Sequence, residues 1–280
     1  MAYKVCFLIS ACLVAAAAAT TPHPEPTLLD QGYRHMYNRE FAEAHQNFQE
    51  WERQKPDDPL GPVSDAAAYL FSEFDRLHIL QSEFFTHDQH FITDNKLSPD
   101  PELKRNFLAA LQASRTLAAR AQSSDQNAMF ATILTNGLES DYSALIEKRY
   151  SVSFQKMKAG RALAEKLLAA DPTCYDAWIA VGVENYMLSV KPAAIRWLLR
   201  IGGGQTDRAL GIEKLKLTAE KGRYLAPFAK MMLAVAAIRD NNNGQARDLL
   251  IGLAAQYPRN PLYRQEIARL EPLALRSTPR

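Results

Sequence analysis

The chain has 280 residues, of which 47% are hydrophobic and 23% are charged, and its formal net charge is +2. This composition is that of a globular protein, long enough for one large domain or an elongated array of repeats. The small net charge provides no electrostatic case for a nucleic-acid or a membrane-surface partner. Abundant alanine and leucine, with few β-branched runs, favour helices.

Residues 1–19 are typical of a secretory signal peptide. Lys4 is followed by an apolar run, Val5–Ala19, which ends in Ala17-Ala18-Ala19 and so offers an A-x-A cleavage site. The run is shorter than the ~20 residues that a membrane-spanning helix needs, and the Pro-rich segment 20–27 follows directly. We therefore expect an exported protein, periplasmic or secreted, without an integral membrane span once the signal is removed.

Two alternatives for the N-terminus remain open. The segment could stay uncleaved as a membrane anchor, or the protein could be a lipoprotein, because Ile9-Ser10-Ala11 precedes Cys12 much as in a lipobox. Removal of the segment would leave Cys174 as the last cysteine, and a single cysteine cannot form an internal disulfide. The fold must then depend on its apolar core.

Residues 28–59 predict a first helical hairpin. Gly32 is the small residue of its first helix, and Pro56 ends the second helix because proline lacks the N–H that a helix interior needs. The second helix carries large and small apolar residues at helical spacing, namely Phe41, Ala44, Phe48 and Trp51. A small residue facing larger ones lets two antiparallel helices approach closely.

Residues 60–150 are less regular. One long amphipathic helix is predicted from Ser64 to about His90. Asp100-Pro101-Glu102 is a strong helix start, with an N-cap, proline at the first helical position and acid in the first turn. That helix should end near Gln122, and another, capped by Asp125, should run to about Lys148. We interpret 60–150 as a long-helix insertion or a degenerate repeat.

Residues 151–275 return to a regular pattern of helical hairpins. Gly160 and Ala164 lie on a helix that Pro172 closes, and the next helix runs from Trp178 to Val190. An insert, residues 191–206, then separates this helix from its partner. A last hairpin closes at Pro258, and a polar terminal helix follows, as repeat arrays need for solubility.

The segment Asp171–Asn185 reads D-P-T-C-Y-D-A-W-I-A-V-G-V-E-N. Pro172 closes one hairpin, while Trp178 and Gly182 match the W-x2-L-G-x2-Y opening of a tetratricopeptide repeat. The chain thus resembles secreted bacterial tetratricopeptide-repeat proteins over residues 28–56 and 153–270. This resemblance implies an all-α, right-handed array of antiparallel helical hairpins, and a non-catalytic scaffold that binds a protein or peptide in the cell envelope.

In such repeats the first helix of each hairpin lines a concave groove. The exposed side of these helices is rich in Tyr and Met, which provide large and adaptable contact surfaces. The candidate groove residues are Tyr33, Tyr37, Tyr186, Met187 and Arg239. The alternative is that these side chains are buried against other helices of the same chain.

The insert 191–206 is strongly apolar, with Arg196, Trp197 and Arg200 as its candidate binding residues. It could contact an anionic partner or a membrane surface, or it could pack as a cap over the mouth of the groove. Its Gly202-Gly203-Gly204 run lacks G-K-[ST] and follows no predicted strand, so phosphate binding is disfavoured.

A metal site is the main alternative function, together with binding of another small ligand by the long middle helices. Glu83, His87 and His90 fall on one face of the predicted helix, at spacings that can bind zinc or iron. An active site between repeats is a third option, although no hydrolase motif is present. We expect no cofactor.

Overall fold

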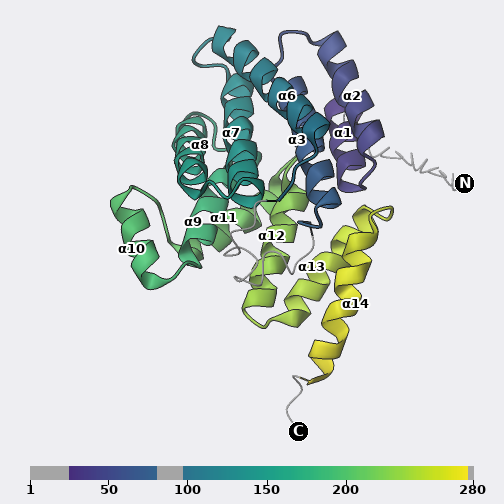
Figure 1. Ribbon diagram of the computed structural model, residues 1–280, viewed down its shortest axis with the longest axis vertical. Helices are drawn as coiled ribbons and strands as arrows, with labels where there is room; N and C mark the ends of the chain where they lie inside the picture. The colour runs from purple at the N-terminus through teal and green to yellow at the C-terminus, as the bar shows by residue number, and fades with distance from the viewer. Residues whose placement is uncertain (1–24, 81–96, 277–280) are drawn as a thin grey trace, which may run out of the picture.

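The computed structural model describes residues 25–80 and 97–276 (Figure 1), and every regular element in these residues is helical. The all-α prediction is therefore confirmed. None of the described helices is both long enough and apolar enough to cross a bilayer. The helices are α1 (Leu28–Tyr37), α2 (Phe41–Gln54), α3 (Leu60–Arg76), α6 (Pro101–Arg120), α7 (Gln126–Asp141), α8 (Tyr150–Ala170), α9 (Trp178–Ser189), α10 (Ala193–Ile201), α11 (Arg208–Lys221), α12 (Ala226–Arg239), α13 (Asn243–Gln256) and α14 (Pro261–Arg276).

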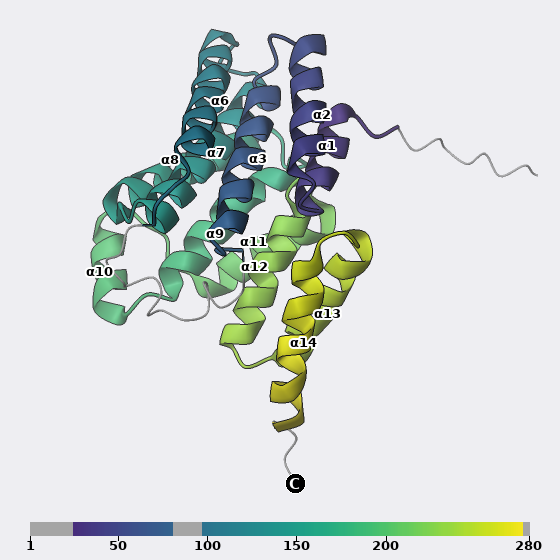
Figure 2. The ribbon, with the colours of Figure 1, turned by 45° about the vertical axis from the view of Figure 1, so that its right-hand side comes forward.

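The helices pack in successive pairs, which is compatible with a helical repeat. α1 packs on α2, α3 on α6, α7 on α8, α9 on α11, and α12 on α13, with α14 against α13. The middle of the chain thus consists of helix pairs like those at either end. α10 has little contact with the rest and projects from one side of the molecule (Figures 1 and 2).

Glycines let two of these pairs approach closely, and the sequence predicts the first of these contacts, at Gly32. A Cβ at Gly32 would lie 2.3 Å from the ring of Phe48, and one at Gly211 would lie 2.6 Å from the main-chain nitrogen of Tyr186. Phe48 and Ala44 are fully buried. Any side chain at these glycines would force the two helices apart.

The three aspartates that precede α6, α7 and α11 act as N-caps. Asp100 accepts hydrogen bonds from the N–H groups of Glu102 and Leu103, and Asp125 accepts one from Ala128. Asp207 accepts one from Leu210 at the start of α11. These side chains satisfy donors that have no partner within the helix.

The prediction of a single helix from Ser64 to His90 is wrong. α3 ends at Arg76, and His78 adopts a left-handed conformation with φ 57°. The N–H of Ile79 then bonds to the carbonyl of Phe74, and both side chains are buried. This is a Schellman ending, in which an apolar contact closes the helix even without glycine.

The two ends of the array meet. The Asn260 side chain donates to the carbonyl of Tyr37, and the N–H of Arg259 donates to the side chain of Asn38. Arg223, which precedes α12, pairs with Asp30 of α1 at 2.7 Å. Figure 2 shows the loop between α13 and α14 beneath α1. The first helix pair therefore packs against the last helices rather than forming a free end.

Candidate functional site

The inner faces of the helices form a partly open cavity of about 100 Å³. Its wall comes from α1, α3, α7, α8 and α9 and from the start of α12, and is mostly apolar. On one side of the cavity, the ring centroids of Phe71 and Phe228 lie 6.1 Å apart. Concave, largely apolar cavities of this kind are the usual places for ligands.

Two of the predicted groove residues, Tyr33 and Tyr37, line this cavity. Tyr33 and Tyr37 are buried, because their rings pack on Tyr224 and Tyr257 from the other end of the array. The Tyr33 ring also packs edge-on against Phe48 of α2, at 5.4 Å between centroids. The prediction that the two tyrosines lie open to a partner is wrong, since the meeting of the two ends covers them.

The other predicted groove residues do not line this cavity. Tyr186 is fully buried, with its backbone against Gly211 of α11 and the Arg208 guanidinium 5.8 Å above its ring. Met187 and Arg239 are half-buried. Tyr186 therefore belongs to the contact between α9 and α11, and the prediction that it binds a partner on an open face is also wrong.

Asp141 is the unusual polar residue of the cavity wall. It is the last residue of α7, directly before a π-helical turn, Tyr142–Ile146, of a kind often found at functional sites. Its carboxylate has no hydrogen bond or ion pair among the residues that the structure describes, and burial raises its pKa to about 7. The carboxyl is therefore partly protonated at neutral pH.

The neighbouring polar side chains already have partners. Lys156 also lines the cavity, but its ammonium pairs with Glu139 at 2.8 Å. The Ser140 hydroxyl donates to the carbonyl of Ser153 at 3.1 Å. Neither side chain neutralises Asp141, so this carboxyl is the polar group left for a ligand.

Gly137 opens the cavity one helical turn before Asp141. It lines the wall, and a Cβ built on it would meet no atom within 4 Å. Packing therefore does not require a glycine here, in contrast to Gly32 and Gly211. The missing side chain leaves room beside Asp141.

A second titratable cluster lies between α2 and α3. His45 Nδ1 is 2.5 Å from an Asp65 oxygen, and its ring packs on Tyr69 at 4.0 Å. Burial, with a smaller contribution from Asp65, raises the pKa of Glu52 to about 7. These residues are outside the cavity lining.

The insert does not cap a groove. α10, which carries Arg196, Trp197 and Arg200, has no buried residue, and four of its five large apolar side chains are exposed, while Leu199 is half-buried. The prediction of a packed cap is wrong because the helix turns its apolar side away from the body.

The metal alternative rests on residues that the structure does not describe. Glu83, His87 and His90 lie outside the described ranges, while Asp75 pairs with Arg39 at 2.6 Å. Within residues 25–80 and 97–276, no group of three His, Cys, Asp or Glu side chains is arranged to hold a metal ion.

Sequence reasoning missed Asp141, Gly137 and the His45–Asp65 pair. No motif marks them, although an aspartate on the inner face of an apolar helix was a signal that could have been used. Comparison of the chain with protein-family models, with curated proteins and with solved structures finds no match.

Proposed function

We propose that this chain is a non-catalytic binding protein of tetratricopeptide-repeat type, exported to the bacterial cell envelope, which holds a compact apolar group in its inner cavity. The successive helix pairs support the repeat assignment, as do the glycines at which α1 closely approaches α2 and α11 closely approaches α9. The apolar N-terminal run, Val5–Ala19, supports export.

The unpaired carboxyl of Asp141 carries the proposal. Asp141 is half-buried, and partial removal of an unpaired carboxyl from water costs free energy. A ligand that brings an ammonium or a hydroxyl group would supply the missing partner, while its apolar part would occupy the space beside Gly137. The ligand chemistry is therefore a compact apolar body with a cationic or hydroxyl head.

The closed inner face limits the size of the ligand. An extended peptide needs an open groove along several helices, and here Tyr33 and Tyr37 are covered by the C-terminal part of the chain. One apolar residue at the N-terminus of a protein or peptide partner would fit, as would a free small molecule of the same chemistry. The site has a single unpaired titratable side chain among the described residues, which suits binding better than acid–base catalysis.

Three probes of one shape test the proposal. Benzylamine, benzyl alcohol and benzoate share a phenyl body and differ in the head group. At millimolar concentration we expect benzylamine to raise the melting temperature most and benzoate least, because a ligand that binds the folded state stabilises it. A short peptide with N-terminal phenylalanine carries the same benzyl and ammonium groups and tests the peptide source.

Two glycine variants locate the binding. Gly137→Leu should fill the cavity and abolish the shift in melting temperature. Gly252 also has no atom within 4 Å of an added Cβ, but it lies outside the cavity lining, so Gly252→Leu should preserve the shift. Asp141→Asn should remove the preference for the amine. An equal shift in both glycine variants, or no shift with any probe, would contradict the proposal.

A further inference from the structure

The apolar side of α10 faces solvent. Ile195, Trp197, Leu198 and Ile201 are 45, 62, 60 and 67% exposed, and they are four of the seven large apolar side chains found exposed in the described residues. At 100° per residue they fall on one side of the helix, with Ala194 between them. This concentration marks an interaction surface rather than scattered exposed residues.

The polar side of α10 holds the helix to the body. Arg196 donates to the carbonyls of Ser189 and Lys191, at 3.4 and 2.7 Å. Arg200 Nε donates to the Thr206 hydroxyl at 2.5 Å. A helix on the surface of a globular protein usually has the opposite orientation, with its apolar side inward.

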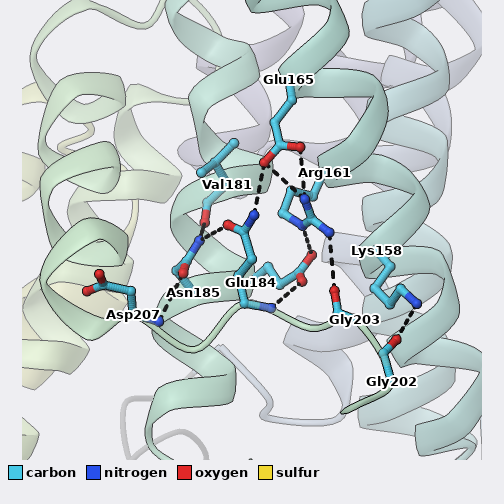
Figure 3. Close-up of polar contacts among 10 residues, drawn as sticks. Lys158, Arg161, Glu165, Val181, Glu184, Asn185, Gly202, Gly203 and Asp207 are labelled. Carbon is cyan, nitrogen blue, oxygen red and sulfur yellow. Dashed lines mark hydrogen bonds and ion pairs between the residues drawn. The ribbon is translucent and has the colours of Figure 1, made fainter. Parts of the chain in front are cut away.

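The loop after α10 is fixed by a polar network, which Figure 3 shows. The buried Glu184 carboxylate accepts from the N–H of Gln205 and pairs with Arg161, each at 3.0 Å. Arg161 also donates to the carbonyl of Gly203, and Lys158 donates to that of Gly202. The direction of α10 is therefore set by bonds at both of its ends.

The charges around this apolar side are positive. Residues 191–206 contain Lys191, Arg196 and Arg200 and no acidic residue, although the whole chain has a net charge of only +2. The hydrogen-bond partners of Arg196 and Arg200 are neutral oxygens, and among the described residues no carboxylate pairs with either guanidinium. The local charge, not the total, decides what this surface attracts.

We propose that the outward side of α10 is a docking surface for an anionic lipid bilayer. Trp197, Leu198 and Ile201 would enter the boundary between headgroups and acyl chains, and the positive charge of residues 191–206 would attract anionic headgroups to this surface. Apolar residues with tryptophan on one side and basic residues on the other are the pattern of helices that lie in a membrane surface. The helix projects from the body (Figure 1), and a soft bilayer accepts such a ridge without a matching groove.

The test must be local to α10, because the apolar run Val5–Ala19 of the full chain could bind vesicles by itself. Vesicles of phosphatidylcholine and phosphatidylglycerol with brominated acyl chains quench a tryptophan that enters the acyl region. We expect quenching of the full chain, and loss of most of it in Trp197→Phe, which keeps Trp51 and Trp178. Half-saturation should need about tenfold more lipid when the vesicles are neutral or the salt is high.

A double variant and a matched control complete the test. Leu198→Ser with Ile201→Ser, which keeps Trp197, should weaken vesicle binding about tenfold or more. Ile251→Ser, at an exposed apolar residue of α13, should leave it unchanged. Equal quenching of wild type and Trp197→Phe would overturn the proposal. So would a dimer, seen by sedimentation without vesicles, that the double variant abolishes, because a second copy would then cover this surface.

Discussion

The Tyr37 hydroxyl donates a hydrogen bond to the main-chain carbonyl of Tyr224, at 3.0 Å and across 187 positions of the chain. Tyr33, one turn before Tyr37, stacks its ring on that of Tyr224 at 4.9 Å. These contacts join the first helix pair to the loop before α12. They convert what would be an open inner face into a cavity.

Loss of the Tyr37 hydroxyl should weaken this closure. We expect Tyr37→Phe to lower the free energy of unfolding by about 1 kcal/mol, because the Tyr224 carbonyl loses a donor in a buried environment. Urea denaturation measures the difference. Tyr175→Phe, on a half-buried ring, is the control and should change stability by less than about half as much.

Asp176 should matter more for the same loop. Its buried carboxylate accepts from the N–H groups of Arg223, Tyr224 and Leu225, each through an oxygen within 3.1 Å. Asp176→Ala leaves these donors without partners, and we expect a loss of about 3 kcal/mol in unfolding free energy. Asp207→Ala removes only an exposed N-cap and should cost about 1 kcal/mol. Equal losses of unfolding free energy in the two variants would contradict a larger contribution from the buried hydrogen bonds of Asp176 than from an exposed N-cap.

Two glycines should respond to alanine in opposite directions. A Cβ at position 137 would meet no atom within 4 Å. We therefore expect Gly137→Ala to raise the free energy of unfolding by about 0.5–1 kcal/mol, because alanine has the better helix propensity. Gly211→Ala would bring a Cβ within 2.6 Å of the Tyr186 nitrogen and should destabilise the protein. Thermal and urea unfolding of the two variants decide the signs.

Asp141 should make stability depend on pH. Burial raises its pKa from an ordinary 3.8 to about 7, so the folded protein holds this proton more tightly than the unfolded chain. The resulting stabilisation is complete below about pH 4 and is lost as the pH rises to about 7. With ~1.4 kcal/mol per pKa unit, the upper limit is about 4 kcal/mol, reduced by water in the cavity.

The Asp141→Asn variant measures this contribution. We expect it to match wild type near pH 4 and to exceed its free energy of unfolding above pH 7, because the amide stays neutral. Asp171 provides a control of opposite sign, since hydrogen bonds from Thr173 hold the pKa of its carboxyl below the ordinary value. Asp171→Asn should therefore lose stability above pH 4. If the free energies of unfolding of wild type and Asp141→Asn depended on pH in the same way, the raised pKa of Asp141 would be contradicted.

Sequence patterns located most of the helices and the residues that terminate them. Asp100 and Asp125 were recognisable as caps because a cap and the N–H groups that it satisfies are adjacent in the chain. The end of α3 was missed, since His78 takes a left-handed conformation that glycine or asparagine usually signals. For the candidate site, Tyr33 and Tyr37 were named from the sequence and line the cavity, but Asp141 was not recognised.

Helix positions and the apolar side of each helix follow from local spacing, and for this reason they can be derived from the sequence alone. The amphipathic character of α10 belongs to this class, as does the approach of Gly32 to Phe48. The tertiary structure alone decides whether the apolar side of a given helix is covered by another helix or faces solvent. Tyr37 meets Tyr224 only when the array closes, and α10 turns its apolar side outward because its arginines bond to the body. The pKa of Asp141 rises because helices distant in the sequence partly bury it.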